Sequence, residues 1–261
     1  MIEAQGLRKE YGGFVAVEGS TFAVEDGEVF GIIGPNGAGK TTTLKMLAGL
    51  LEPSGGTATV AGFDAADSAM RQRLGFLPEE SPLYEEMTPL TYLSFFADLY
   101  DVPAGVAERR MHETLDDLDL AHRERPLGDM SKGMERKVAI ARSLINDPDV
   151  LIYDEPASGL DPLTTNYVID FTESLAADGK TIVFSAHNLF HVESICDRVA
   201  IMNEGAIVAR GDLESLRNEY GDRRYHVYTT VAVEGAEQQN GTWHRVARDM
   251  NGVEATREAA A

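Results

Sequence analysis

Cysteine, lysine and long apolar runs are scarce in this chain of 261 residues, and each shortage excludes a class of protein. The single Cys196 excludes a disulfide within the chain and suits a reducing compartment. No apolar run approaches the roughly 20 residues that a membrane-spanning helix needs. The first residues, Met1–Gly6, lack the charged and then apolar order of a signal peptide. We therefore expect a cytoplasmic protein with one full core and appended subdomains.

Basic residues are also few, since 23 Lys and Arg stand against 43 Asp and Glu, for a formal net charge of −20. The acidic residues are dispersed and form no single tail. We therefore expect a solvated acidic coat, with a cationic partner as the alternative. Nucleic acid is not an expected partner, because phosphate backbones require a basic patch. An acidic, lysine-poor composition resembles that of proteins from halophilic organisms, in which salt screens the self-repulsion.

A phosphate-binding P-loop is the strongest motif in the sequence. Residues Gly34–Thr41 fit the pattern G-x-x-x-x-G-K-[ST], between a strand-like run at Val29–Ile33 and a helix-like run at Thr42–Leu50. Such a loop aims backbone N–H groups at an anion, while Lys40 adds a positive charge and the Thr41 hydroxyl holds Mg²⁺. The predicted triphosphate-binding residues are Gly34, Asn36, Gly37, Ala38, Gly39, Lys40, Thr41 and Thr42. The chain is therefore expected to bind a nucleoside triphosphate.

Two carboxylates follow a second apolar run and complete the predicted site. Val150–Tyr153 is expected to form a central parallel strand, buried on both faces, and Asp154 and Glu155 come directly after it. In that position Asp154 is expected to hold Mg²⁺, and Glu155 to act as the general base or to orient the attacking water. The alternative is a strand that simply ends in two solvated acids.

Further motifs occur in a fixed order along the chain. Tyr11 lies near the N-terminus and Glu79 follows a short apolar strand; Met130–Met134 precedes the carboxylate strand, Ser158–Asp161 follows it, and His187 ends a later strand. In this order they resemble the adenine-stacking aromatic residue, the Q-loop, the signature sequence, the D-loop and the switch histidine of the ATP-binding cassette (ABC) ATPases. The resemblance covers about residues 1–219 and implies ATP as ligand and Mg²⁺ as cofactor.

The resemblance assigns a role to each of these residues. Tyr11 is expected to stack on adenine, although a turn tyrosine before two glycines is the alternative. Glu79 is expected to contact Mg²⁺. His187 is expected to act with Glu155, by hydrogen-bonding the γ-phosphate and holding the carboxylate and the water in register.

The signature residues imply a second subunit. Ser131 and Gly133 open a helix predicted at Met134–Ile145, whose N-terminus presents free N–H groups. By resemblance, this helix end caps the γ-phosphate on the P-loop of another subunit, and Asp161 belongs to the same nucleotide site. ATP would then join two subunits head to tail. An ordinary capped helix also predicts a serine at this position.

Three positions depart from the family pattern. Lys132 stands where the signature has glycine, Met134 where it has glutamine, and Glu79 where the Q-loop has glutamine. The Ser-Lys-Gly-Met form resembles the ABC-2-type exporter branch. Lys132 either adds attraction to the phosphate or points at solvent, and Glu79 keeps an oxygen for Mg²⁺ but adds a negative charge beside the triphosphate.

An α/β fold is expected: a P-loop NTPase (RecA-like) parallel core sheet with an antiparallel β subdomain and an inserted helical subdomain. Residues 1–221 are expected to form the ABC ATPase domain, with the helical subdomain at about 80–146. Residues 222–261 are expected to form a small C-terminal extension with strands at 225–233 and 242–248 and a frayed tail after Arg257. The expected core strands are 29–33, 74–77, 150–154, 181–185 and 199–202, and antiparallel strands are expected at 2–24.

The function implied is that of the ATP-hydrolysing subunit of an ABC exporter. Two such subunits, as a homodimer or a paired ATPase, would act beneath a multi-spanning membrane permease, peripheral on the inner face of the membrane. The segment Ser81–Tyr92 matches the region where family members grip that partner. The alternative is a soluble ABC ATPase that acts on a macromolecular assembly, which one P-loop, one signature and no heptad insertion make less favoured. The transported substrate cannot be read from this chain.

Overall fold

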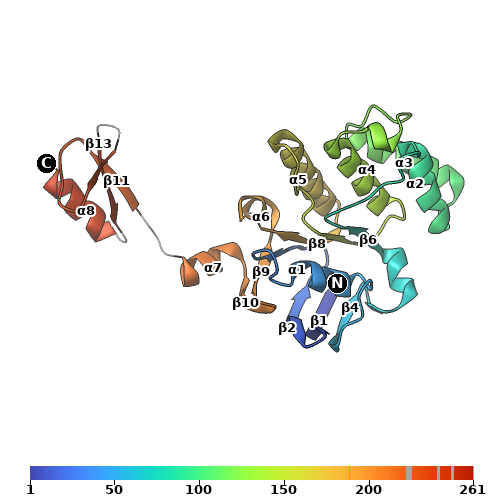
Figure 1. Ribbon diagram of the computed structural model, residues 1–261, viewed down its shortest axis with the longest axis horizontal. Helices are drawn as coiled ribbons and strands as arrows, with labels where there is room; N and C mark the ends of the chain where they lie inside the picture. The colour runs from blue at the N-terminus through green and yellow to red at the C-terminus, as the bar shows by residue number, and fades with distance from the viewer. Residues whose placement is uncertain (188, 222–224, 240–241, 248–249, 261) are drawn as a thin grey trace. The chain divides into compact units, whose positions relative to one another are not determined.

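The computed structural model of the chain describes residues 1–187, 189–221, 225–239, 242–247 and 250–260 (Figure 1). These residues divide into two compact units, Met1–Leu213 and Glu214–Ala261. The sequence placed the boundary at 221/222, where the family resemblance ends, whereas the structure divides at the start of helix α7, Leu213–Tyr220. None of the described helices is long and apolar enough to cross a membrane.

A six-stranded sheet forms the centre of the first unit, in the order β10-β9-β3-β8-β7-β6. Its five neighbouring strands from β9 to β6 are parallel, and β10 pairs antiparallel with β9 at the edge. Every residue of β3, β7 and β8 is buried, as expected for parallel strands that are covered on both faces. The predicted parallel core is confirmed. The strands are β3 Val29–Ile33, β6 Leu74–Leu77, β7 Val150–Tyr153, β8 Thr181–Ala186, β9 Arg198–Asn203 and β10 Ala206–Gly211.

An antiparallel sheet covers one side of this core, in the order β2-β1-β4-β5. Helix α1, Lys40–Leu47, contacts β1, β2 and β4 of this sheet and β8 of the parallel sheet, so it lies between the two layers. Its side chains Leu44 and Leu47 are completely buried there. The strands are β1 Ile2–Tyr11, β2 Phe14–Val24, β4 Gly55–Val60 and β5 Phe63–Asp64. The predicted antiparallel subdomain is therefore present and packs around the helix that follows the P-loop.

Helices fill the stretch expected to be helical, and Figure 1 shows α2, α3 and α4 gathered beside β6. Thr88 and Thr91 form a capping box at the start of α2, and Pro89 takes the first helical position. The helix α4 contacts α2, α3 and β6, and thus joins this subdomain to the core sheet. The elements are 3₁₀ helix η1 Ser68–Arg73, α2 Pro89–Leu99, α3 Ala104–Asp117, 3₁₀ helix η2 Leu127–Asp129 and α4 Lys132–Leu144.

Two further helices belong to the other side of the parallel sheet. These are α5, Pro162–Ala177, and α6, Leu189–Ile195, which contacts α5, β3 and β8. At Gly31 a side chain would collide with Cys196, since an added Cβ would lie 2.8 Å from the sulfur. Burial raises the pKa of the Cys196 thiol, so the one cysteine is a packing residue rather than a nucleophile.

The second unit is a small antiparallel sheet with one helix. Its strands β11 Tyr225–Thr229, β12 Glu237–Gln239 and β13 Thr242–Ala247 lie in the order β11-β13-β12. The strands expected near 225–233 and 242–248 are thus present, although β11 ends at Thr229. Helix α8, Met250–Ala259, contacts β11 and β13 and includes much of the tail that was expected to fray.

The acidic composition predicts a fold that is more stable in salt. With 43 acidic against 23 basic residues, self-repulsion destabilises the compact state at low ionic strength. We expect the Tm to rise by several degrees as KCl increases from about 0.05 M to about 0.5 M, because the Debye length, the distance over which charges interact, falls in this range. Thermal unfolding followed by circular dichroism measures this. A Tm that rises only above this range would indicate solute exclusion, and an unchanged Tm would contradict the prediction.

Candidate nucleotide-binding site

The predicted P-loop follows the carboxyl end of β3, an inner strand of the parallel sheet, and leads into α1. Helix α1 begins at Lys40 and ends at Leu47, so it starts two residues earlier and ends sooner than the sequence indicated. Gly39 has φ +101°, and an added Cβ there would lie 2.6 Å from the carbonyl oxygen of Ala16. At Gly34 an added Cβ would lie 2.3 Å from the carbonyl oxygen of Met202. Both glycines are therefore required by the close approach of neighbouring backbone.

A cavity of about 410 Å³ opens in front of this loop. Most of the predicted triphosphate-binding residues line it, together with Tyr11 and Glu79, and the catalytic candidate Glu155. Gly34 lies behind the loop and does not line the cavity. The predicted residues on its wall are Asn36, Gly37, Ala38, Gly39, Lys40, Thr41 and Thr42. The backbone N–H groups of the first turn of α1 have no partner within the helix, which is the arrangement that binds phosphate.

Lys40 is buried in this cavity with only 6% of its side chain exposed. Its ammonium donates to the carbonyl oxygens of Gly34, at 2.9 Å, and Pro35, at 3.3 Å. It also lies 3.3 Å from Oε1 of Glu155. A positive charge held by neutral carbonyl groups and one carboxylate is available to an incoming phosphate, which would replace the weaker carbonyl contacts.

The two predicted carboxylates follow β7 directly, and a hydroxyl from β8 links them. Ser185 donates from Oγ to Oδ1 of Asp154 at 2.6 Å and accepts from the backbone N–H of Glu155 at 2.9 Å. Asp154 is 1% exposed and Glu155 is 8% exposed. The alternative of two solvated acids is therefore wrong. Ser185 was not predicted; a hydroxyl at the end of an apolar strand, two residues before His187, is the only sequence signal for it.

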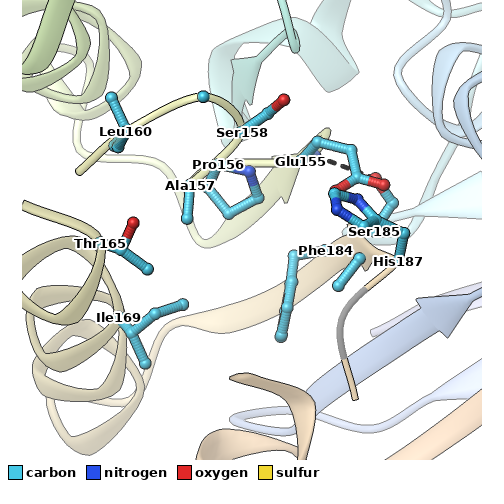
Figure 2. A pocket seen from close by; sticks show the side chains of 12 residues that line it. Glu155, Pro156, Ala157, Ser158, Leu160, Thr165, Ile169, Phe184, Ser185 and His187 are labelled. Atoms are coloured by element: carbon cyan, nitrogen blue, oxygen red, sulfur yellow. Dashed lines mark hydrogen bonds and ion pairs between the residues drawn. The ribbon is translucent and has the colours of Figure 1, made fainter. Parts of the chain in front are cut away.

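Glu155 and His187 lie together as the sequence predicted. The Nδ1 atom of His187 is 2.9 Å from Oε2 of Glu155 (Figure 2). Oε1 of Glu155 is buried and accepts no hydrogen bond of good geometry, although the Lys40 ammonium is within ion-pair distance. The backbone of Glu155 is left-handed, with φ +48°, a conformation uncommon outside glycine. One oxygen is thus fixed by His187, and the other faces the Lys40 ammonium and keeps lone pairs for a proton or a water molecule.

The donor set fits Mg²⁺ only together with phosphate. The Thr41 hydroxyl and Glu79 line the cavity, and Asp154 lies beside it with one oxygen held by Ser185. Within the described ranges, no group of three or more His, Cys, Asp or Glu side chains is placed to hold a metal ion. Mg²⁺ is usually bound by one or two protein oxygens plus substrate phosphates and water, so these residues suit it.

Two aromatic rings flank the turn between β1 and β2 at the mouth of the cavity. Tyr11 is 48% exposed and Phe14 is 67% exposed, and both line the cavity. The Lys9 ammonium lies 5.2 Å from the centroid of the Tyr11 ring. A purine can therefore stack on the ring face that Lys9 leaves open, as the resemblance predicted. Phe14 was not predicted, and its exposure on the cavity rim is visible only in the structure.

The signature residues lie outside this cavity. Ser131 is the N-cap of α4, and its Oγ accepts from the backbone N–H of Met134 at 3.3 Å. Within a single chain, Ser131 therefore acts as the ordinary helix cap that was the alternative from the sequence. Gly133 begins the same helix, at a short distance from Thr164 of α5. Neither residue lines the P-loop cavity, so their role toward the triphosphate of a second subunit stays a prediction.

Asp161 caps another helix. Its Oδ1 accepts from the backbone N–H groups of Leu163 and Thr164, each at 3.1 Å, and the Thr164 hydroxyl donates to Oδ2 at 2.6 Å. These hydrogen bonds hold the pKa of Asp161 below its usual value. Asp161 does not line the P-loop cavity, and its assignment to the nucleotide site also stays a prediction.

A buried arginine holds the segment that carries Glu79 by hydrogen bonds to its backbone. Arg136 of α4 is 5% exposed, and its guanidinium donates to the carbonyl oxygens of Pro78, at 2.9 Å, and Glu79. Burial lowers the pKa of Arg136, with the Glu79 charge opposing that shift. The Glu79 side chain accepts from Oγ of Ser158 at 3.4 Å. Arg136 was missed by the sequence analysis, because a lone arginine within a helix carries no pattern.

Comparison with known proteins agrees with this site. A family model described as "ABC transporter" matches residues 17–158. The chain is 40% identical to the ABC transporter ATP-binding protein NatA of Bacillus subtilis, over 84% of this chain and 92% of that protein. It is 36% identical to the Nod factor export ATP-binding protein I of Ralstonia nicotianae, over 98% of this chain and 84% of that protein. The chain therefore belongs to the ATP-binding proteins of ABC transporters.

Solved structures lead to the same fold. The ATP-binding subunit of an ABC transporter is 34% identical, with a TM-score of 0.78, over 85% of this chain and 93% of that one. CbiO1 of Clostridium perfringens, part of the transporter complex CbiONQ, is 27% identical with a TM-score of 0.75. The match covers 84% of this chain and 91% of CbiO1. The chain spans only 66% and 62% of the length of two cyanobacterial relatives, from Nostoc and Synechocystis.

Proposed function

We propose that this chain binds Mg-ATP and hydrolyses it as the ATPase subunit of an ABC exporter, beneath a separate membrane permease. The observation that carries the proposal is the position of Glu155, between Lys40 at 3.3 Å and His187 at 2.9 Å, on the wall of the P-loop cavity. Bound Mg-ATP supplies the transferable phosphoryl group and a divalent charge beside it. Relatives named for Nod factor export and linearmycin resistance support the exporter assignment.

The residues of the chain have distinct tasks in this proposal. Lys40 moves from the carbonyl oxygens of Gly34 and Pro35 to the phosphates and stabilises their charge. The free oxygen of Glu155 takes a proton from the attacking water, while His187 holds the other oxygen.

A dimer completes the site in this proposal. Ser131, Gly133 and Asp161 do not line the cavity of their own chain, so they are available to a second copy or a paired ATPase. Ser131 is exposed at the start of α4, where free N–H groups can meet the γ-phosphate that another P-loop holds. ATP binding would close the two subunits and hydrolysis would separate them.

An aromatic patch on the helical subdomain is the proposed permease surface. Its exposed rings are Tyr84 and Phe95, which contact each other and pack on the half-buried Phe96 and the buried Tyr92 in edge or tilted contacts. Tyr84 is 56% exposed and Phe95 is 44% exposed, and Tyr84 belongs to the segment 81–92 that the sequence indicated. Exposed aromatic residues in contact are typical of protein interfaces.

A groove beside the patch extends this surface. The cavity of about 200 Å³ is lined by apolar side chains, including the exposed Leu50, and by two arginines, Arg71 and Arg142. Arg142 donates to the Tyr92 hydroxyl and to the Phe76 carbonyl oxygen, and neither arginine has a carboxylate partner among the described residues. Two arginines without a carboxylate partner are unusual in so acidic a chain, and they favour a partner segment that is apolar and carries an acidic group. The chain would then be held at the inner face of the membrane by its permease.

The test is a tagged pull-down of the Glu155→Gln protein from detergent-solubilised membranes of the host, with Mg-ATP and high salt. We expect a multi-spanning membrane protein in stoichiometric amount, because the variant accumulates in the ATP-bound dimer. The variant Phe95→Ala in the same background should lose this partner and keep its affinity for ATP. Val208→Ala removes an exposed apolar side chain from β10, at the opposite edge of the sheet, and should change nothing. Ribosomal or iron–sulfur proteins in place of a permease would contradict the transporter.

A further inference from the structure

The lysine that departs from the signature pattern lies against the D-loop of its own chain. A Cβ atom added to Gly159 would lie 2.2 Å from Nζ of Lys132 and 3.3 Å from its Cε. Gly159 has φ +67°, a left-handed conformation that favours glycine. The side chain of Lys132 therefore fills the space that a side chain at position 159 would occupy. Lys132 is exposed, as the solvent alternative from the sequence has it, but its ammonium also lies beside the D-loop.

A second contact lies one residue further along α4. A Cβ atom added to Gly133 would lie 3.1 Å from Cγ2 and 3.3 Å from Oγ1 of Thr164. The same Thr164 hydroxyl donates to Oδ2 of Asp161, the last residue of the D-loop segment Ser158–Asp161. The start of α4 thus lies beside the D-loop segment at Lys132, and Gly133 is linked to its other end indirectly, through Thr164.

Two of the three residues that depart from the family motifs, Lys132 and Glu79, line one cavity. The cavity measures about 460 Å³, and its wall includes Lys132, Glu79 and Ser158. Oγ of Ser158 donates to Oε1 of Glu79 at 3.4 Å, so the D-loop is tied to the Glu79 segment as well. Glu79 also lines the P-loop cavity, so it lies between the two spaces. The P-loop cavity is therefore connected to the D-loop through Glu79 and its hydrogen bond from Ser158.

The charge around Lys132 explains its position without a salt bridge. Glu79, Glu80 and Glu135 line the same cavity, and Arg136 is the other cation there. No carboxylate of the described residues lies within 4.0 Å of the Lys132 ammonium, since it takes part in none of the ion pairs found. The acidic wall attracts the ammonium as a whole, and the absence of a side chain at Gly159 leaves the space in which the ammonium lies.

We propose that Lys132 is a positioning residue that makes the signature helix and the D-loop move together. Its side chain spaces Gly159 from the start of α4, so a shift of that helix on meeting a second subunit's nucleotide is passed to Ser158–Asp161. The inference rests on the proposed function, because it assigns the signature to the ATP site of a second subunit. Through this coupling, the presence of ATP at one site of the dimer changes the position of the D-loop beside the second site.

A double-mutant cycle of Lys132→Ala and Gly159→Ala tests this proposal. Gly159→Ala inserts a methyl group where the Lys132 ammonium lies, so its effect depends on which residue stands at 132. We expect each single variant to lower kcat and the Hill coefficient for ATP, and the two effects to be non-additive by about fivefold in kcat. Backbone strain at φ +67° is common to both backgrounds and cancels in the cycle. The Kd of a fluorescent ATP analogue should stay the same, because Lys132 does not line the P-loop cavity.

Lys137 provides the matched control on the same helix. Its ammonium lies 4.3 Å from the centroid of the Tyr167 ring and has no contact with the D-loop in the described structure. The cycle of Lys137→Ala with Gly159→Ala should therefore be additive. Lys132→Met, which keeps an unbranched stem, replaces the alanine variant if that protein unfolds, and should retain more of kcat than alanine does.

The outcomes separate this inference from the function on which it rests. A Lys132→Ala protein with an altered Kd for the ATP analogue and an additive cycle would mean that the lysine acts on the phosphate, and would overturn the inference alone. A Glu155→Gln protein that stays monomeric with Mg-ATP would overturn the dimer and, with it, the inference. A non-additive cycle in a protein that forms the dimer supports both.

Discussion

The variant Glu155→Gln is expected to hydrolyse ATP at least about 100-fold more slowly than the parent protein, because a positioned general base contributes about 10²- to 10⁴-fold. Gln keeps the length of Glu and can hold the contact with His187 at the same place, so the cavity stays intact. ATP binding should be kept or strengthened, since the substitution removes a negative charge 3.3 Å from Lys40 and near the γ-phosphate. Steady-state phosphate release and equilibrium binding measure the two effects separately.

The same substitution is also expected to trap the closed dimer. With Mg-ATP, size-exclusion chromatography should show a dimer for Glu155→Gln and mostly monomer for the parent, because the parent hydrolyses the ATP that joins the subunits. Glu173→Gln makes the same charge change at an exposed position of α5 and should leave both rate and assembly unchanged. Turnover by Glu155→Gln at the parental rate would show that another group activates the water.

The backbone of the site was predictable from the sequence. Glycine at positions 34 and 39 is required where neighbouring carbonyl oxygens lie within 2.6 Å of an added Cβ, so spacing along the chain encodes the loop. An apolar run followed by Asp154 and Glu155 similarly encodes a buried strand and its end. The motif spacing marks the two glycine positions without any knowledge of the carbonyl oxygens that exclude a side chain there, which belong to Ala16 and Met202, far away in the sequence.

Contacts between distant parts of the chain were not predictable. Ser185 lies 31 positions from the Asp154 that it holds, and Arg136 lies 58 positions from Pro78. A single serine or arginine belongs to no period or motif, so nothing in the sequence ties it to its partner. The placement of Lys132 on Gly159 has the same origin, since the stem of an exposed lysine follows whatever backbone the fold brings beside it.

The C-terminal tail shows how packing overrides a local tendency. The sequence analysis expected the chain to fray from Arg257 onward, as chain ends do, and Asn251 and Gly252 earlier in the segment 250–259 favour helices poorly. In the structure α8 contacts β11 and β13, and Thr256 is completely buried. Tertiary contacts of this kind supply most helical stability, so the helix forms where propensity alone argues against it.

Replacing Lys40 with Ala is expected to weaken ATP binding by more than about 100-fold. That factor corresponds to about 2.7 kcal/mol, within reach of the charge-assisted hydrogen bonds that one ammonium makes to phosphate oxygens. The loss should appear in equilibrium binding of Mg-ATP measured by calorimetry, and hydrolysis should fall with it. Lys45→Ala removes the same charge from an exposed position of the same helix and should bind ATP as the parent does.

The substitution at Lys40 has a second effect that must be separated from the first. Lys40 and Glu155 are both buried, and removing one partner of a buried ion pair costs about 3–5 kcal/mol of stability. We expect the lower end of that range here, because the cavity admits water and His187 still contacts Glu155. The double variant Lys40→Ala/Glu155→Gln removes both charges and should recover most of the unfolding free energy in urea. ATP binding should stay lost in it, because the lost contact is to phosphate; recovered binding would instead mean that the single variant bound poorly through a damaged fold.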